Sequence, residues 1–443
     1  MDNIEKIEEE ILILVEKYSK IKFRKDKYIP GKDVIQASGK YISEDEIINM
    51  VSASLDGWLT AGRFNQEFEK KLSKYIDVKH LMTVNSGSSA NLVAFNTLTS
   101  PRLGEKAIKK GDEVITVAAG FPTTINPIIQ FGAIPVFVDI RQDTLNIDEK
   151  LVEKCLSSKT KAVMVAHTLG NPFNLSSIVD FCEKNNLWLI EDCCDALGAK
   201  YEGKHVGTFG DIASLSFYPA HHITMGEGGA VFTNSSRLKR IAESYRDWGR
   251  DCYCPPGEDN TCNKRYCWKS ASIGGSLPVG YDHKYTYSHL GYNLKITDMQ
   301  AACGLGQINK IEKFIEIRKR NYHLLLKGLR EFENHFYFAR PTDSSSPSWF
   351  GFPITIKNNS KINRSELINY LKENKIGTRL LFAGNVTKQP YFDAIEYRIV
   401  GALKNTDKVM RDTFWIGLHQ LVGEDSIKYI IKVISNFIKE KIN

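Results

Sequence analysis

The stretch Ser214-Leu-Ser-Phe-Tyr-Pro-Ala-His-His-Ile-Thr-Met-Gly-Glu-Gly-Gly229 joins two apolar runs, at residues 212–217 and 229–233, that we predict to be strands. Its polar middle contains His221, and the sequence has no lysine from His205 to Leu238. An imidazole moves protons near neutral pH, but it cannot hold a carbonyl compound as a stable imine. The stretch therefore predicts proton-transfer chemistry beside a sheet.

Strand-like apolar runs alternate with helical stretches from about residue 51 to residue 310. This alternation is typical of an α/β fold with a mostly parallel sheet, in which ligands gather at the carboxyl ends of the strands. A smaller α+β domain is predicted for residues 311–443, and a helical segment for residues 1–50. The predicted strands of the large domain are residues 80–84, 113–117, 134–139, 162–167, 188–192, 212–217 and 229–233.

Three regions add to this pattern. Residues 250–287 are rich in cysteine, glycine, proline and aromatic residues without a regular period, which predicts a long functional loop in the large domain. One helix is predicted from residue 299 to about residue 329. The first twenty residues predict an amphipathic surface helix, whose packing residues would be Ile4, Ile7, Ile11, Leu14 and Val15.

Small and polar residues follow several of the predicted strands. The turn Asn85-Ser-Gly-Ser-Ser-Ala90 opens a helix, so its N–H groups and hydroxyls can approach a phosphate, and Ser216 offers a further hydroxyl. Asp192 ends a strand, where a carboxylate can keep a pyridine nitrogen protonated, and Phe121 is placed to stack on a planar ring. Taken singly, these residues also serve as caps or core, and both interpretations stay open.

Taken together and in order, residues 57–307 resemble the DegT-type nucleotide-sugar aminotransferases. The matching segments are Ser86-Gly-Ser-Ser89, Pro135-Val-Phe-Val-Asp139, Glu191-Asp192, Ser214-Leu-Ser-Phe217, Gly226-Glu-Gly-Gly229 and Gly291-Tyr-Asn-Leu-Lys-Ile-Thr-Asp-Met-Gln-Ala-Ala302. The resemblance covers more than half of the chain. It implies the aspartate-aminotransferase-like fold of type I pyridoxal-phosphate enzymes, with a large coenzyme-binding domain and a smaller C-terminal domain.

The resemblance also implies roles for the matching residues. The coenzyme would be bound by Gly87, Ser88 and Ser216 at the phosphate, Asp192 at the pyridine nitrogen, Phe121 on the ring face and Asp195 near the ring hydroxyl. Asn293 matches a residue that reaches the phosphate from the neighbouring subunit, which implies a homodimer. Lys295 stands where the family often has arginine, so a bidentate anion contact is in doubt there. Arg379 is a candidate for binding the sugar or the diphosphate.

His221 departs from the family, in which a lysine at this position anchors the coenzyme. A branch with histidine here consists of 3-dehydrases of 4-keto-6-deoxy sugars, which bind pyridoxamine phosphate without a covalent bond. Resemblance to this branch implies that the amine condenses with the sugar C4 ketone and that His221 removes a proton, so that the C3 hydroxyl leaves. An imidazole suits this step because its pKa lies near neutrality. Tyr218 is predicted to assist the proton transfer.

Cysteine spacing distinguishes two subtypes of this branch. The subtype that carries a [2Fe–2S] cluster, and acts on CDP-4-keto-6-deoxy-D-glucose in 3,6-dideoxyhexose biosynthesis, is matched by Cys194, Cys252, Cys254 and Cys262. Four thiolates suit zinc equally well, and the neighbouring Cys193 or Cys267 can replace a ligand. A cluster implies reduction of the dehydrated glucoseen adduct by a separate NAD(P)H-dependent flavin and iron–sulfur reductase, because the chain has no G-x-G-x-x-G turn.

Two alternatives remain open at this point. The first is a cluster-free 3-dehydrase that regenerates its amine coenzyme from glutamate, which would leave Cys252, Cys254 and Cys262 without a purpose. The second is a regulatory protein that keeps the fold without catalysis. Such a protein would not need Asp192 or Ser216.

The bulk composition argues against other classes of function. The formal charge of +7 is thinly spread, without a basic block interleaved with aromatic residues, so no nucleic-acid partner is expected. No apolar run reaches the roughly 18 residues of a membrane span. The acidic N-terminus is unlike a secretory signal, so we expect a cytoplasmic protein. Nine cysteines in that compartment indicate metal or redox chemistry rather than disulfides.

Overall fold

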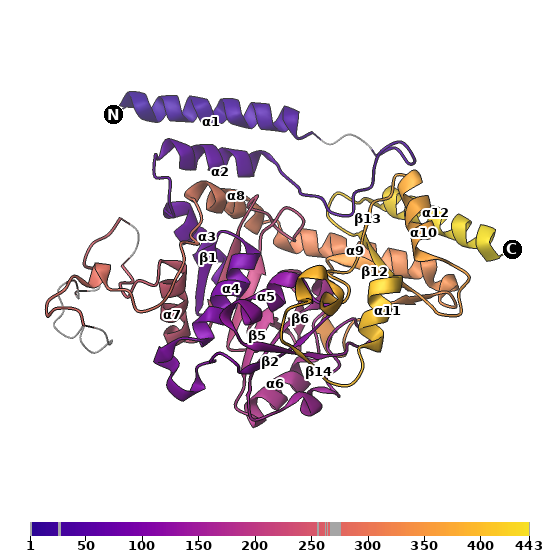
Figure 1. Ribbon diagram of the computed structural model, residues 1–443. Helices are drawn as coiled ribbons and strands as arrows, with labels where there is room; N and C mark the ends of the chain where they lie inside the picture. Colours follow the sequence, from indigo (N-terminus) through magenta and orange to yellow (C-terminus); the bar gives the residue numbers. More distant parts are fainter. Residues whose placement is uncertain are drawn as a thin grey trace.

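Eight of the described strands form one central sheet in the computed structural model of the protein, which describes residues 2–24, 28–254, 257–261, 263, 265 and 276–442 (Figure 1). The strand order is β1-β9-β8-β5-β4-β2-β3-β14. The strands β8, β5, β4, β2, β3 and β14 run parallel, whereas β9 is antiparallel to both of its neighbours. Their bounds are β1 His80–Val84, β2 Glu113–Val117, β3 Ile134–Val138, β4 Thr160–Ala166, β5 Trp188–Asp192, β8 Ile212–Ser216, β9 Gly229–Thr233 and β14 Arg398–Ile399. The predicted α/β fold is confirmed.

Burial explains why the central strands were readable in the sequence. Strands β2, β5, β8 and β9 are buried at every residue, as expected for strands covered by helices on both faces. Four predicted strands have the predicted bounds, and the other three differ from them by one or two residues at one or both ends. The helices between these strands are α4 Gly87–Leu98, α5 Pro122–Phe131, α6 Leu175–Lys184 and α7 Ser236–Arg246.

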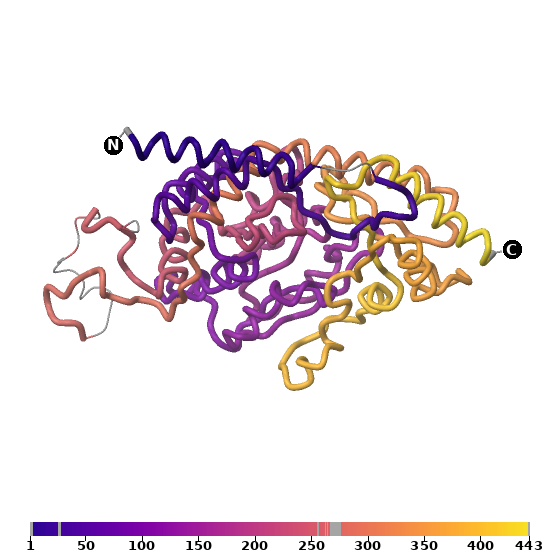
Figure 2. Tube along the Cα trace, turned by 90° about the horizontal axis from the view of Figure 1, so that it is seen from above, coloured from indigo at the N-terminus to yellow at the C-terminus, as the bar shows by residue number. Residues whose placement is uncertain are grey.

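The helices at the start of the chain lie along one edge of the molecule (Figures 1 and 2). Helix α1 (Asp2–Lys22) runs beside α2 (Glu44–Leu55), and α3 (Arg63–Ile76) follows. The predicted helix is present, but its predicted packing face is only partly correct. Ile11 and Val15 are half-buried, whereas Ile4 is 72% exposed and Leu14 is 64% exposed.

The long helix predicted from residue 299 is two helices in the structure. Helix α8 (Asp298–Ile308) begins with a capping box, in which the Thr297 side chain accepts from Gln300 N–H and the Gln300 side chain accepts from Thr297 N–H. Helix α9 (Ile311–Leu329) follows α8 with two residues between them. The break was missed because the apolar pattern continues through it, and its turn contains neither glycine nor proline.

The C-terminal part of the chain builds a second, antiparallel sheet of order β10-β12-β15-β13. Its elements are β10 Phe336–Phe338, β12 Gly351–Ile356, α10 Arg364–Glu373, β13 Thr378–Arg379, α11 Lys404–Asp412, β15 Thr413–Gly417 and α12 Glu424–Ile442. Two segments of this part join sheets of the large domain: β14 pairs with β3, and β11 (Ser345–Ser346) pairs with β6 (Lys200–Tyr201), which also pairs with β7 (Lys204–His205). Among the described helices, each is too short or too polar to cross a membrane.

Candidate active site

A cavity of about 590 Å³ lies where the carboxyl ends of the parallel strands face the small sheet. Its wall combines predicted site residues that lie far apart in the sequence. From the large domain come Gly87, Ser88, Phe121, Asp192, Cys194, Asp195, Ser216, Tyr218 and His221, and from the C-terminal part come Phe350, Arg379, Leu380, Phe382 and Trp415. The structure therefore brings most of the predicted site residues to one place.

The first turn of α4 and the end of β8 form an anion cradle. Ser86 caps α4 by accepting a hydrogen bond from Ser89 N–H at 3.1 Å, which leaves the other first-turn N–H groups directed outward. A β carbon on Gly87 would lie 2.4 Å from the β carbon of Ser216, so glycine is required for this close approach. The helix N-terminus, Ser88 and Ser216 together can hold a phosphate.

Asp192 is held in one orientation by two side chains that sequence analysis missed. Its Oδ2 accepts from Asn91 Nδ2 at 2.8 Å and from Thr124 Oγ1 at 2.7 Å. Its Oδ1 accepts from Cys194 N–H at 3.1 Å. The carboxylate is thereby fixed at the cavity wall, where it can pair with a protonated ring nitrogen. Asn91 and Thr124 lie inside apolar helical stretches, and their only sequence signal is a buried polar residue in such a stretch.

His221 lies against Asp195 in the cavity, with His221 Nδ1 3.4 Å from Asp195 Oδ1. Burial, and then the positive charge of Arg318, lowers the pKa of His221 to about 4. Burial, and then the negative charge of Asp192, raises the pKa of Asp195 to about 8. At neutral pH the imidazole of His221 is therefore neutral, which is the form able to accept a proton.

Arg318 is a second residue that sequence analysis missed. It is 1% exposed and donates to the carbonyl oxygens of Phe350, at 3.0 Å, and Trp349, at 3.4 Å. Burial lowers its pKa to about 10, and the guanidinium still opposes protonation of His221. In the sequence it is one of many charged residues of α9, and nothing marks it as the one that turns inward.

Two aromatic residues of the predicted site are unusually open. Phe121 is 50% exposed and lines the cavity, with its ring centroid 6.2 Å from that of Phe382. Tyr218 is 51% exposed, and its ring centroid lies 6.4 Å from that of His221. An exposed phenylalanine face at the cavity can stack on a planar ring, and the Tyr218 hydroxyl can reach a bound substrate.

Asn293 does not line the cavity of its own chain. Its Oδ1 accepts from Lys295 Nζ at 2.8 Å, and Lys295 lies 3.6 Å from Asp247. Arg379, by contrast, lines the cavity from strand β13 and is exposed there. The predicted contribution of Asn293 to a neighbouring subunit stays a prediction.

The predicted cluster ligands do not converge in the described part of the structure. Cys194 lines the active-site cavity, and burial beside Asp192 raises the pKa of its thiol well above the usual value. Cys252 and Cys254 line a different, small cavity in the segment after α7, which extends outward from the large domain in Figures 1 and 2. Cys262, and likewise Cys267, lies outside the described residues. The three described thiols therefore do not form a ligand set within this chain.

One other group of possible metal ligands exists among the described residues: His167, Glu191 and Cys193. His167 Nε2 lies 3.0 Å from Glu191 Oε2. The Glu191 carboxylate accepts hydrogen bonds from the backbone N–H groups of Gly207, at 2.7 Å, and Gly210, at 2.6 Å. All three side chains are buried, and the carboxylate is fully engaged with the backbone. The group fastens the loop before β8 to β5.

Comparisons with known proteins agree with this geometry. The model of the DegT/DnrJ/EryC1/StrS aminotransferase family matches residues 41–435. The chain is 58% identical to the lipopolysaccharide biosynthesis protein RfbH of Salmonella typhimurium, over 97% of this chain and 98% of that protein. It is 47% identical to the dTDP-4-dehydro-2,6-dideoxy-D-glucose 3-dehydratase of Saccharopolyspora spinosa, over 93% and 88%. A structure of Escherichia coli GDP-4-keto-6-deoxy-D-mannose-3-dehydratase with bound hydrated PLP superposes with a TM-score of 0.81 at 27% identity, covering 91% of this chain and all of that one.

Proposed function

The chain belongs to the DegT/DnrJ/EryC1/StrS aminotransferase family, and from that premise we propose that it is a pyridoxamine-phosphate-dependent 3-dehydrase of 4-keto-6-deoxy nucleotide sugars. One observation carries the proposal. His221 stands in the cavity beside Asp192 and Asp195, and no lysine is among the described residues that line it. Without that lysine the coenzyme cannot be anchored as an imine, so its amine form is the one that the site would hold.

The residues present fit this coenzyme. Among the described side chains, His221 Nδ1 and Asp195 Oδ2 are buried without a hydrogen-bond partner. Unpaired buried polar atoms are costly, so their position at the cavity supports a polar ligand there. The anion cradle at Gly87 and Ser216 and the fixed carboxylate of Asp192 match the phosphate and the ring nitrogen of one such ligand.

The roles of the chain's own groups follow from this placement. When bound, pyridoxamine phosphate supplies a primary amine for the ketone of the sugar and a ring that accepts electrons. Ser88 and Ser216 bind the phosphate, and Asp192 holds the proton on the ring nitrogen. The neutral imidazole of His221 accepts a proton, and the Tyr218 hydroxyl assists proton transfer to the leaving hydroxyl.

We further propose that the substrate is CDP-4-keto-6-deoxy-D-glucose and that the route leads to 3,6-dideoxyhexoses. The support is the resemblance of the sequence to dehydrases of that sugar, and Arg379 is the proposed contact for the sugar or its diphosphate. Turnover of CDP-, dTDP- and GDP-linked 4-keto-6-deoxy sugars should be compared under identical conditions. Equal or faster dehydration of the dTDP- or GDP-linked sugar would overturn the CDP assignment.

The proposals of a [2Fe–2S] cluster and of a flavin and iron–sulfur reductase as partner rest on the cysteine spacing read through the family resemblance. The structure keeps Cys194 apart from Cys252 and Cys254, so no step is assigned to a cluster. Anaerobic preparation followed by iron and sulfide analysis and electron paramagnetic resonance tests this point. About two irons per chain are expected for such a cluster. A colourless, zinc-loaded and fully active preparation would contradict it.

The placement of Cys194 in a different cavity from Cys252 and Cys254 favours a second candidate, the cluster-free 3-dehydrase that uses glutamate. That enzyme would turn over with glutamate and without a reductase. Multiple turnovers of the Cys252→Ser and Cys254→Ser variants with glutamate would establish it. Strict dependence on a reductase would exclude it.

Removal of the base tests the central proposal. The His221→Asn variant should still bind pyridoxamine phosphate, because the phosphate cradle and Asp192 are unchanged. It should lose dehydration of the sugar by at least about 100-fold, the usual contribution of a general base. Product formation is followed by chromatography of the nucleotide sugar. Activity equal to that of the parent would show that another group is the base.

The proposed homodimer rests on Asn293, which would reach the phosphate of the neighbouring subunit. Mixing an Asn293→Ala chain with a His221→Asn chain tests this by complementation. A mixed dimer should regain one intact site, so activity should exceed that of either variant alone. No gain after subunit exchange would contradict a shared site.

A further inference from the structure

Helix α1 presents an apolar stripe that the described residues of the chain leave largely exposed, with only Ile11 half-buried. Its members recur with the spacing of a heptad, three and four residues apart. We call them the outer stripe: Ile4, Ile7, Ile11, Leu14, Tyr18 and Ile21. Ile4 is 72% exposed, Leu14 64% and Ile21 79%, values unusual for a row of large apolar side chains on one helix.

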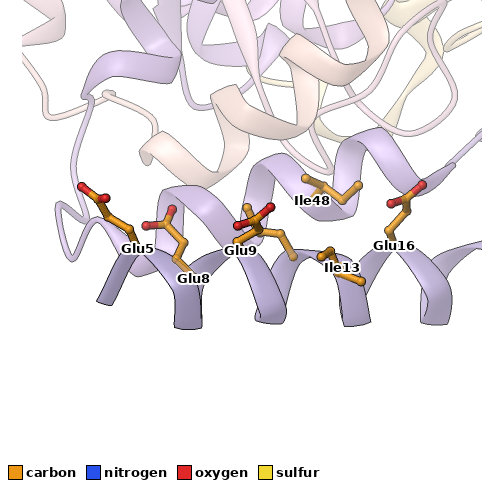
Figure 3. A pocket seen from close by; sticks show the side chains of 7 residues that line it. Glu5, Glu8, Glu9, Ile13, Glu16 and Ile48 are labelled. Atoms are coloured by element: carbon orange, nitrogen blue, oxygen red, sulfur yellow. The ribbon is translucent and has the colours of Figure 1, made fainter. Parts of the chain in front are cut away.

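Packing within the chain uses a different face of α1. The groove between α1 and α2 is lined by Leu12 and Ile13, by Ile48 of α2, and by carboxylates. Figure 3 shows Glu5, Glu8, Glu9 and Glu16 along this groove, with Ile13 and Ile48 between them. The outer stripe is therefore not the face that holds α1 on the protein.

The stripe also lies outside the part of the chain that the family defines. The family match begins at residue 41, whereas α1 ends at Lys22. The α1 segment has 21 residues, so it is about 31 Å long and offers three heptads. The catalytic cavity accounts for none of these residues.

We propose that the outer stripe pairs with the outer stripe of a second copy of this chain, with the two α1 helices antiparallel. Charge along the helix favours this occupant. Residues 3–10 contain four glutamates and one lysine, whereas residues 11–22 contain three lysines and one glutamate. Antiparallel pairing places each acidic half beside a basic half, and such complementarity fixes orientation and partner.

The residues that flank the stripe distinguish the two orientations. In an antiparallel pair, Glu10 faces Lys17 of the partner subunit, and this contact occurs twice by symmetry. In a parallel pair, Glu10 would face Val15, and Lys17 would face Lys22 of the partner subunit, a like-charge contact. The sequence of α1 therefore favours the antiparallel arrangement and disfavours the parallel one.

The acidic groove also argues against a membrane as the occupant. Helices that lie on anionic membranes carry lysine and arginine beside their apolar face. Here the carboxylates of Glu5, Glu8 and Glu9 line the groove beside α2, and those of Glu8 and Glu10 flank the outer stripe. Anionic headgroups would be repelled by the half of α1 where these glutamates are concentrated.

Sedimentation velocity of the full chain over a range of concentrations tests the pairing. The variant Ile7→Glu/Leu14→Glu/Tyr18→Glu should lose one association step that the parent shows, with a dissociation constant raised on the order of 100-fold or more. Val34→Glu replaces an exposed apolar residue outside α1 and should associate like the parent. Parental association of the triple variant would overturn the proposal, provided that its circular dichroism is unchanged.

Disulfide trapping tests the orientation. The antiparallel register brings residue 7 of one copy beside residue 18 of the other. A mixture of Ile7→Cys and Tyr18→Cys chains should therefore form a 7–18 disulfide, identified by mass spectrometry of the linked peptides. A parallel pair would instead give 7–7 and 18–18 disulfides in each variant alone, which would overturn the antiparallel assignment. The parent chain, with its nine native cysteines, serves as the control.

Vesicle flotation tests whether the outer stripe binds a membrane instead of a second copy of the chain. With vesicles of phosphatidylcholine and phosphatidylserine, the parent should stay unbound at physiological salt. Flotation of the parent that the triple substitution abolishes would overturn self-pairing as the role of the outer stripe. The experiments do not depend on turnover, so their outcome is separate from that of the proposed dehydrase activity.

Discussion

Replacing His221 with lysine gives a quantitative test of the cavity's electrostatics. Burial and Arg318 lower the pKa of the imidazole from 6.5 to about 4, which corresponds to roughly 3 kcal/mol against the charged form. The same penalty on an ammonium group would move the pKa of the new lysine from roughly 10.4 to about 8. About half of the amines would then be neutral at pH 8, compared with fewer than about one in 100 for an exposed lysine.

A neutral amine beside Asp192 should form an imine with added pyridoxal phosphate, seen as a visible absorption band. The band should grow between about pH 7 and pH 9 with a midpoint near 8, and borohydride should fix the coenzyme covalently to residue 221. His221→Asn is the matched control, because it also removes the imidazole but introduces no amine. A midpoint near 10 would refute the assigned burial and charge, and a variant without any band would refute the placement of residue 221 at the coenzyme.

Three further predictions follow from the described contacts. Thr124→Val removes a 2.7 Å hydrogen bond to Asp192 and should weaken binding of pyridoxamine phosphate roughly tenfold in a spectroscopic titration. Gly87→Ala would place a methyl group 2.4 Å from a β carbon of β8, so phosphate and coenzyme affinity should fall together; unchanged affinity by calorimetry would contradict the cradle. Burial lowers the pKa of His419 to about 4, so its contribution to the free energy of unfolding is complete above about pH 6.5 and is lost as the pH falls toward 4. Urea unfolding of the parent should show a loss of up to about 3 kcal/mol from this residue over that range. The loss should be smaller in the His419→Gln variant.

The buried strands could be predicted because their signal is local. Runs such as residues 134–138 and 229–233 are mostly apolar and short, so composition and length sufficed to identify them. The site residues at strand ends, Asp192 and Ser216, followed from the same pattern combined with the family resemblance. Because β5 and β8 are parallel neighbours, both residues line the same cavity.

Residues that act through tertiary contacts could not be predicted. Asn91, Thr124 and Arg318 are important because they contact residues that are distant in the sequence. The spacing of residues in the sequence does not indicate such contacts. The packing face of α1 was only partly predicted for a related reason. The apolar residues of the helix recur with one period, and the sequence does not tell whether the face that they form meets the rest of the chain.

The pairing of β14 with β3 has a consequence for how the molecule unfolds. Arg398 of β14 donates to the Glu113 carboxylate at 2.6 Å, so a segment near the end of the chain is tied to a central strand. The C-terminal part cannot unfold without removing β14 from the edge of the large sheet. Both parts should therefore melt in a single cooperative transition, and truncation after residue 390 should unfold both parts instead of releasing a shorter stable protein.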